Sequence, residues 1–250
     1  MQINTFFDFC SGIGGGRLGL ENCGLNCVGH SDTSRLSDTT YMQMFDTCND
    51  KNYGNLKKLN GNDLPKYDLL IAGFPCQTFS VIGQKAGFND DRGQIIFQLI
   101  RLLDESRPKC FILENVKGLV THDKGQTIKT IMKEFENIDY HVSYRVFTSL
   151  EHGVPQMRQR VYFVGFDKRA GLSGKGVSFW SVPKMARTTS GWHSRTAPRS
   201  RHNPIDAETS LNHIGSEAFL LYIDLFYLAY WGSGIFIEQY HIFPFREYCA

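Results

Sequence analysis

Apolar residues in the first 168 positions fall into short runs that alternate with longer segments of helical spacing. The short runs predict strands at residues 5–8, 27–31, 67–73, 110–113, 142–147 and 161–166. The helical spacing predicts one helix that starts near residue 17 and others over residues 33–45, 94–103 and 128–135. Regular alternation of strand and helix predicts an α/β fold with a doubly wound, mostly parallel sheet.

The last two predicted strands have no predicted helix between them. Only a loop that contains Pro155 separates residues 142–147 from residues 161–166, and this loop is too short to hold a crossover helix. We therefore expect these two strands to pair antiparallel, as a terminal hairpin on the parallel sheet.

The character of the chain changes beyond residue 183. Residues 185–202 contain four arginines and no acid, which favours a flexible basic segment over the alternative of a phosphate-contacting arm. Residues 218–231 form an apolar block that is shorter than a membrane span and carries Asp224 near its centre. We interpret this block as a core helix or as sequence not selected to fold, and we expect no membrane anchor. The predicted division is a main domain, residues 1–183, and an atypical C-terminal region, residues 184–250.

The overall composition is that of an ordinary globular protein. The formal net charge of +2 does not indicate a nucleic-acid partner, so a DNA-binding surface would need local clustering of basic residues. Seven cysteines, an odd number, argue against a disulfide framework and favour a reduced, cytoplasmic protein. Cys23 and Cys27 have no second pair at zinc spacing, so no metal site is expected. The first residues lack the basic and apolar regions of a signal peptide.

A glycine-rich turn follows the first predicted strand. Residues 8–15 read Asp-Phe-Cys-Ser-Gly-Ile-Gly-Gly, and glycine lets the backbone turn tightly and approach a ligand closely. Asp32 follows Gly12 by twenty residues, at the end of the second predicted strand, where an acid can bind ribose hydroxyls. The pattern misses the dinucleotide-binding fingerprint, because Arg17 stands where the third glycine belongs. The segment therefore indicates an adenosine-type ligand or a plain glycine turn.

Three further segments place reactive groups near strand ends. Cys76 follows the third predicted strand and precedes a polar loop that could close over a substrate; a buried structural thiol is the alternative. Glu114 ends the next buried strand, where burying an acid costs free energy unless the acid is paired or has a functional role. Arg158 and Arg160 alternate onto one face of the last strand, which suits either anionic and carbonyl oxygens or a solvated edge. A thiol and a carboxylate at adjacent strand ends can act as nucleophile and acid.

Taken in order, these segments resemble the DNA cytosine C5 methyltransferase family of restriction-modification type. The resemblance rests on Pro75-Cys76-Gln77, Glu114-Asn115-Val116 and Gln156-x-Arg158-x-Arg160 at these spacings. It covers residues 4–168, with a weaker match at residues 179–183. It implies a class I, Rossmann-like fold and S-adenosyl-L-methionine as the methyl donor.

The resemblance also implies a covalent mechanism on cytosine in double-stranded DNA. The Cys76 thiolate would attack C6 of a flipped-out base, so that C5 takes the methyl group from the sulfonium of the donor. Glu114 would hold N3 and the amino group, Arg160 would contact the carbonyl, and Arg158 would position active-site groups. Donor contacts are implied for Asp8, Phe9, Cys10, Gly12, Ile13, Gly14, Asp32, Asn55 and Pro75. DNA contacts are implied for Gln77, Ser80, Arg92 and Asn115.

Three departures from the family pattern affect these expectations. Cys10 stands where the family most often has an aromatic residue that stacks on adenine. Asn55 stands where the family usually has an acid. The Arg and Glu segment and the closing helix of the family are not found in residues 185–250. Their absence indicates a truncated chain, a frame change or one half of a split enzyme.

We weigh three alternatives to a complete DNA methyltransferase. An RNA cytosine methyltransferase shares the fold, and residues 74–77 favour the DNA enzymes only slightly. A non-catalytic fragment would bind donor or DNA without turnover, or would need a complementing chain. An NAD-dependent oxidoreductase fails on the glycine spacing and explains neither Cys76 nor Glu114. Besides DNA, the expected partners are a cognate restriction endonuclease or a complementing chain.

Overall fold

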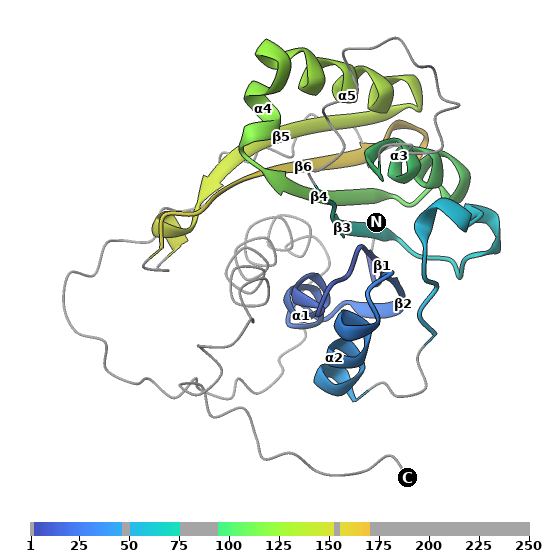
Figure 1. Ribbon diagram of the computed structural model, residues 1–250. Coiled ribbons are helices and arrows are strands. Elements are labelled where there is room, and N and C mark those ends of the chain that lie inside the picture. Colours follow the sequence, from blue (N-terminus) through green and yellow to red (C-terminus); the bar gives the residue numbers. More distant parts are fainter. Residues whose placement is uncertain (1–2, 47–50, 76–94, 153–155, 171–250) are drawn as a thin grey trace.

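A six-stranded sheet runs through the part of the chain that the computed structural model describes, residues 3–46, 51–75, 95–152 and 156–170 (Figure 1). Its strands are β1 (Thr5–Phe9), β2 (Asn26–Ser31), β3 (Leu69–Gly73), β4 (Cys110–Val116), β5 (Tyr140–Thr148) and β6 (Gln159–Asp167). They lie in the order β2-β1-β3-β4-β6-β5. The first four are parallel, and β6 is antiparallel to both β4 and β5. The predicted mostly parallel sheet with a terminal antiparallel hairpin is therefore confirmed.

Helices connect the strands. The described α-helices are α1 (Gly15–Glu21), α2 (Arg35–Phe45), α3 (Ile95–Ser106), α4 (Gly118–Thr121) and α5 (Gln126–Asn137). Short 3-10 turns complete the connections at η1 (Leu56–Lys58), η2 (Gly61–Asp63), η4 (His122–Gly125), η5 (Ser149–His152) and η6 (Lys168–Ala170). The predicted alternation of strand and helix is thus present up to β5.

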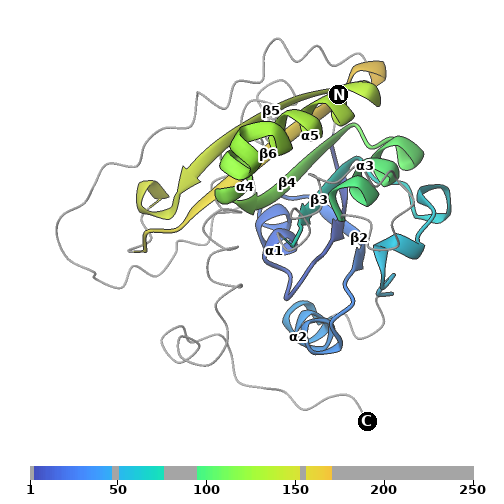
Figure 2. The same ribbon diagram turned by 45° about the horizontal axis from the view of Figure 1, so that its top comes forward.

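The two faces of the sheet carry different helices. Figures 1 and 2 show α3, α4 and α5 together on one side and α1 on the other. Leu99 of α3 packs in one core with Phe111 of β4, whereas Leu20 of α1 packs in a second core with Ile71 and Ile112. Successive strand residues point to opposite faces, so each central strand supplies side chains to both cores.

Most element boundaries differ from the predicted ones by up to three residues, and two of these differences have a clear physical cause. β4 continues to Val116 instead of ending at residue 113, because its last residues, from Glu114 on, pair antiparallel with β6. Backbone hydrogen bonds therefore extend the strand through polar positions at which the apolar run stops. α1 begins at Gly15 rather than near residue 17, because Gly14, at φ 93°, serves as its left-handed N-cap.

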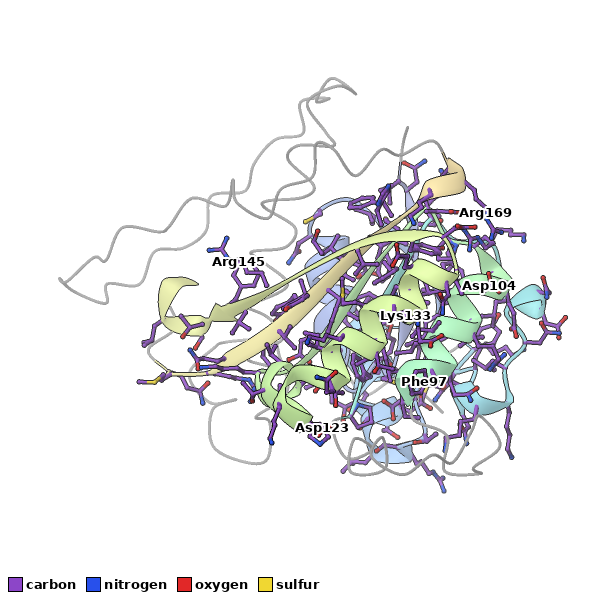
Figure 3. All side chains as sticks on the ribbon, turned by 90° about the horizontal axis from the view of Figure 1, so that it is seen from above. Phe97, Asp104, Asp123, Lys133, Arg145 and Arg169 are labelled. Carbon is purple, nitrogen blue, oxygen red and sulfur yellow. The ribbon has the colours of Figure 1, made fainter. Side chains whose placement is uncertain are left out.

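Ion pairs join the chain at the edge of the sheet where β4 begins and β6 ends. Arg107 pairs with Asp167, and the Arg169 Nη2 lies 2.8 Å from the Asp139 Oδ2. In Figure 3, Arg169 marks this edge and Asp123 marks the opposite one, where β4 ends. The fold is thus tied by charged pairs at the edge that lies away from the candidate site.

Several predictions concern residues that the structure does not describe. The basic segment at residues 185–202, the apolar block at residues 218–231 and the boundary at residue 183 all lie outside the described ranges. Within those ranges, no helix combines the length and the apolar content that crossing a bilayer requires.

Candidate functional site

The candidate site lies at the edge of the sheet where the parallel strands end. β1 leads into the glycine turn, β2 leads into Asp32, β3 leads towards Pro75, and β4 carries Glu114 near its end. Ligands of open α/β sheets bind along this kind of edge. The antiparallel β6 enters at the same edge, with Arg160 as its second residue. The fold therefore brings together groups that lie far apart in the sequence.

Gly12 is the open position of the glycine turn. Its φ of 55° lies in the left-handed region, and a Cβ built on it would meet nothing within 4 Å. Its N–H donates to the Asp32 Oδ2 at 2.9 Å, and the Ser34 N–H donates to the Oδ1 at 2.7 Å. Asp32 thus fixes the turn to the end of β2 while the space beside Gly12 stays open for close approach of a ligand.

Asn52, which the sequence patterns missed, ties the Asn55 segment to Asp32. The Asn52 Oδ1 accepts the N–H of Asp32 at 3.2 Å and that of Gly54 at 2.7 Å, and its Nδ2 donates to the Asp32 carbonyl at 3.1 Å. Asn55 lies directly after Gly54 and caps η1 by accepting the Lys57 N–H at 3.0 Å. Asparagine is common in ordinary turns, so the sequence alone offers no reason to choose Asn52.

Two residues predicted to contact the donor have buried side chains that contact other residues of the protein instead. The Phe9 ring is fully buried and stacks on Phe7, with ring centroids 4.3 Å apart. The Asp8 carboxylate is buried and accepts a hydrogen bond from the Tyr41 hydroxyl at 3.5 Å. A donor contact by Phe9 would therefore have to use its backbone.

Cys10 brings a neutral thiol to the site. Its φ of 49° lies in the left-handed region, which few residues other than glycine adopt. Burial raises the pKa of its thiol, and the charges of Asp32 and Asp8 raise it further. Cys10 and the nearby Ile13 are both half-buried. Such a side chain can touch an adenine ring but cannot stack on it as an aromatic residue would.

Glu114 and Arg160 form a buried ion pair. The Arg160 Nε lies 2.8 Å from the Glu114 Oε1, and the two side chains are only 15% and 6% exposed. Positions two apart on a strand share a face, so both lie on the sheet face of Ile112 and Tyr162. Burial raises the pKa of Glu114 to about 7, although Arg160 and Arg158 act to lower it. The carboxyl can therefore exchange a proton near neutral pH, as general acid-base catalysis requires.

The raised pKa of Glu114 should make the stability of the fold depend on pH. Because the native state favours the neutral carboxyl, ionisation destabilises it as pH rises from the ordinary pKa of 4.5 to the native pKa of about 7. This span corresponds to roughly 3 kcal/mol. Glu114→Gln cannot ionise. We therefore expect its free energy of unfolding to rise relative to that of the wild type as pH increases across this window. Above the window, the difference between the two proteins should stay constant. Urea unfolding at pH values below, within and above the window measures this, and parallel curves for the two proteins would contradict it.

The backbone that precedes Cys76 is held by residues of β4. The Phe74 N–H donates to the Glu114 carbonyl at 3.3 Å, and the Asn115 Nδ2 donates to the Phe74 carbonyl at 2.9 Å. The Asn115 Oδ1 accepts the Val116 N–H at 2.8 Å. Asn115 therefore orients the chain two residues ahead of Cys76, which is a different use from the predicted DNA contact.

The remaining predicted site residues divide into two groups. Pro75 is exposed at the end of the described segment that follows β3. Cys76, Gln77, Ser80 and Arg92 lie outside the described residues, so their roles stay predictions.

Ser149 places Arg158 and was also missed by the sequence patterns. The Arg158 N–H donates to the Ser149 Oγ at 3.1 Å, and the Ser149 N–H donates to the Arg158 carbonyl at 3.0 Å. The Ser149 hydroxyl donates to the Gln156 carbonyl, and the residue is fully buried. A single serine in a connection has no periodic signal, so only the folded chain shows that it closes the turn between β5 and β6.

Known proteins resemble the chain over the same region. A sequence profile of the family described as C-5 cytosine-specific DNA methylase matches residues 4–219. The type II methyltransferase M1.ScrFI of Lactococcus lactis subsp. cremoris is 43% identical over 164 residues, which are 65% of this chain and 41% of that protein. The type II methyltransferase M.HhaI of Haemophilus parahaemolyticus is 37% identical over 161 residues, which are 64% of this chain and 48% of that protein. The chain spans about half the length of the curated relatives that it matches.

Solved structures share the fold. A protein described as a DNA modification methyltransferase encoded in an E. coli prophage has a TM-score of 0.53 and 25% identity, and the match covers 68% of this chain and 48% of that one. A DNMT2 structure from Spodoptera frugiperda has the same TM-score at 22% identity, covering 74% of this chain and 53% of that one. At this identity the second likeness speaks for the fold alone, and it supports the predicted class I, Rossmann-like architecture.

Proposed function

The chain belongs to the C-5 cytosine-specific DNA methylase family, and we propose that it transfers a methyl group from S-adenosyl-L-methionine to C5 of cytosine in double-stranded DNA. The observation that carries this proposal is the ion pair between Glu114 and Arg160 beside the backbone of Phe74, which leads into Cys76. Addition to a pyrimidine ring requires a proton-exchanging carboxyl, a guanidinium and a nucleophilic thiol, and the chain places the first two beside the segment that leads to Cys76.

The residues at the ends of β1 and β2 fit the methyl donor. Gly12 leaves space for the close approach of a nucleoside, and the Asp32 carboxylate lies next to it at the position suited to ribose hydroxyls. Asn55 replaces an acid with an amide, which can still hydrogen-bond an adenine edge. When bound, S-adenosyl-L-methionine supplies a methyl group on a positively charged sulfur. We propose that the turn around Gly12, together with Asp32 and Asn55, orients this group towards the cytosine.

Side chains of the protein then activate C5 of the cytosine, which is otherwise a poor nucleophile. The Cys76 thiolate adds to C6, and the electron pair of the C5–C6 double bond becomes available at C5. Glu114 donates its carboxyl proton to N3 of the cytosine and accepts a hydrogen bond from the amino group, and it thereby stabilises the ring as electron density shifts towards N3. Arg160 binds the carbonyl oxygen of the base, and Arg158 helps to keep Glu114 and Arg160 in place.

The last steps of the proposed reaction release the methylated base from Cys76. After C5 has taken the methyl group, it loses its proton to water, and expulsion of Cys76 restores the C5–C6 double bond. A stacked base pair would not let Cys76 reach C6, so the cytosine must leave the helix, and the polar loop after Cys76 is proposed to close on it. Gln77, Ser80 and Arg92 of this loop are the proposed DNA contacts.

Donor binding should depend on Asp32. We expect Asp32→Ala to weaken the binding of S-adenosyl-L-homocysteine by about tenfold to a hundredfold, because hydrogen bonds to a charged group each contribute roughly 1.5–3 kcal/mol. Isothermal titration calorimetry measures this loss. The matched control is Asp63→Ala at the exposed end of η2, which should bind as the wild type does. Equal affinity in Asp32→Ala and the wild type would remove Asp32 from the donor site.

The proposal is tested by incubating the full chain with tritium-labelled S-adenosyl-L-methionine and mixed-sequence DNA or RNA. Label recovered as 5-methylcytosine in double-stranded DNA is the expected result. Label in RNA alone would support the RNA methyltransferase alternative. Donor binding without transfer to either nucleic acid would contradict independent activity of this chain.

We propose a non-catalytic or complementing role as the second candidate. The matched regions are 38% to 51% of the relatives' own lengths, from M.BanI of Aneurinibacillus aneurinilyticus to M.HaeII of Haemophilus aegyptius. We propose that residues 1–183 form the donor-binding and catalytic domain, and that residues 184–250 form a separate, atypical region. In this second candidate, the chain binds donor or DNA without turnover, or acts together with a complementing chain. A cognate restriction endonuclease is a further proposed partner, because the relatives are type II methyltransferases.

A further inference from the structure

The Asp8 carboxylate lies at the end of β1 but faces helices α1 and α2. Its residue is 3% exposed, and its Oδ2 accepts the Tyr41 hydroxyl at 3.5 Å. It is also hydrogen-bonded to the backbone of Arg17, the third residue of α1. The first four N–H groups of a helix have no partner within it, and the N-cap of α1, Gly14, has no side chain to offer. Asp8 therefore completes the first turn of α1 from outside the helix.

Tyr41 is fixed in this position by β2 and by its own helix. The residue is fully buried, and its ring stacks on the His30 ring with centroids 4.1 Å apart. The His30 Nε2 lies 2.9 Å from the Asp38 Oδ1, and the Tyr41 hydroxyl lies 3.7 Å from the Cys27 Sγ. The hydroxyl is thus held at the Asp8 carboxylate by contacts on several sides.

The aromatic rings of Tyr41 and Phe45, both on α2, also pack against Gly14 at the end of the glycine turn. A Cβ built on Gly14 would lie 2.1 Å from the Phe45 Cε2 and 3.0 Å from the Tyr41 Cδ2. The Arg17 guanidinium lies over the Phe45 ring, 4.5 Å from its centroid. Helix α2 therefore touches the turn at both ends, at Asp8 and at Gly14, with Gly12 between them.

We propose that Asp8 and Tyr41 are positioning residues of the donor site, with Asp8 acting as an external cap on α1 rather than as a ligand of the donor. Through Tyr41, α2 sets the shape of residues 12–14 and thereby the placement of the Gly12 N–H against Asp32. This inference rests on the proposed donor site, and it replaces the direct donor contact that the family resemblance implies for Asp8. It predicts that the charge of Asp8 is dispensable while its hydrogen-bond acceptor is not.

Conservative variants separate the two roles of Asp8. Asp8→Asn keeps a carbonyl oxygen for the Arg17 N–H and an amide group that can hydrogen-bond the Tyr41 hydroxyl, so it should bind S-adenosyl-L-homocysteine within about threefold of the wild type. Asp8→Ala and Tyr41→Phe remove an acceptor and a donor, and each should weaken binding by about tenfold. Titration calorimetry on the full chain gives these ratios. Tyr144→Phe, a half-exposed tyrosine of β5, is the control and should have no effect. A loss in Asp8→Asn as large as that in Asp8→Ala would overturn the inference, because it would show that the charge contacts the donor.

A second measurement does not depend on donor binding. Amide hydrogen exchange of the full chain without ligand should be faster over residues 11–18 in Tyr41→Phe than in the wild type, and unchanged over β3 and β4. Tyr144→Phe should exchange as the wild type does in both regions. If the wild type fails to bind the donor, the proposed function fails, yet faster exchange confined to residues 11–18 would still support the role of Tyr41. Unchanged exchange in that segment would overturn it.

Discussion

Cys76→Ser is expected to lower methyl transfer to DNA by at least about a thousandfold. At neutral pH a few per cent of an ordinary cysteine is thiolate, whereas a serine hydroxyl is not measurably ionised and is a far weaker nucleophile towards C6. Tritium transfer from labelled S-adenosyl-L-methionine to mixed-sequence DNA measures the loss. Donor affinity should stay at the wild-type value, since the proposed donor residues Gly12, Asp32 and Asn55 lie after β1, after β2 and directly before η1.

Cys23→Ser is the matched control for this substitution. Cys23 is a half-buried thiol that packs against the α1 side of the core, away from the candidate site. We expect this variant to transfer methyl groups at the wild-type rate. Equal activity in Cys76→Ser and the wild type would exclude the covalent mechanism, and inactivity of all three proteins would favour a fragment that requires a second chain.

Glu114→Gln is expected to lower the rate of transfer by about 10²- to 10⁴-fold, the range typical of removing a general acid or base. Glutamine has nearly the same size and retains an acceptor, but it cannot carry a proton to and from the base. The pKa of about 7 adds a second signature, because the wild-type pH-rate profile should have a limb near pH 7 that the variant lacks. Steady-state kinetics between about pH 5 and 9 measure both effects.

Glu136→Gln, on the exposed surface of α5, is the control for Glu114→Gln. It should leave both the rate and its pH dependence unchanged. If Glu114→Gln kept the limb near pH 7, that limb would belong to another group, and the proposed proton role of Glu114 would be wrong. The unfolding experiments on the same variant show independently whether it is folded at each pH.

The order and type of the elements could be predicted because their apolar patterns are unambiguous. The residues of α3 show a continuous helical stripe, and residues 69–73 form an uninterrupted apolar run. The end of β4 could not be predicted in the same way. Glu114 interrupts the apolar run, and only pairing with β6 together with the ion pair to Arg160 makes a strand of this polar segment.

The family motifs point to individual residues of the candidate site, but the sequence does not show which way each side chain faces. A sequence places Asp8 at a strand end but does not say whether its carboxylate faces a ligand or the helix beside it. Tyr41 has the spacing of an ordinary buried helix residue, so its hydroxyl contact with Asp8 has no sequence signal. Ser149 and Asn52 hydrogen-bond to backbone groups of Arg158 and Asp32, which lie 9 and 20 residues away in the sequence, and such contacts become visible only in the fold.

The position of β6 in the sheet has a consequence for how the protein folds. β6 follows β5 in the chain but lies between β4 and β5, so among the described strands β5 pairs with β6 alone. β5 therefore cannot join the sheet when it is synthesised, and it has to wait until β6 can be inserted against β4. Glu114 is made 46 residues before Arg160, the difference between their sequence numbers, and it has no guanidinium partner on β6 during that interval. The docking of the hairpin is therefore the step that both completes the sheet and creates the charged pair, so an incompletely folded chain would lack the proposed chemistry.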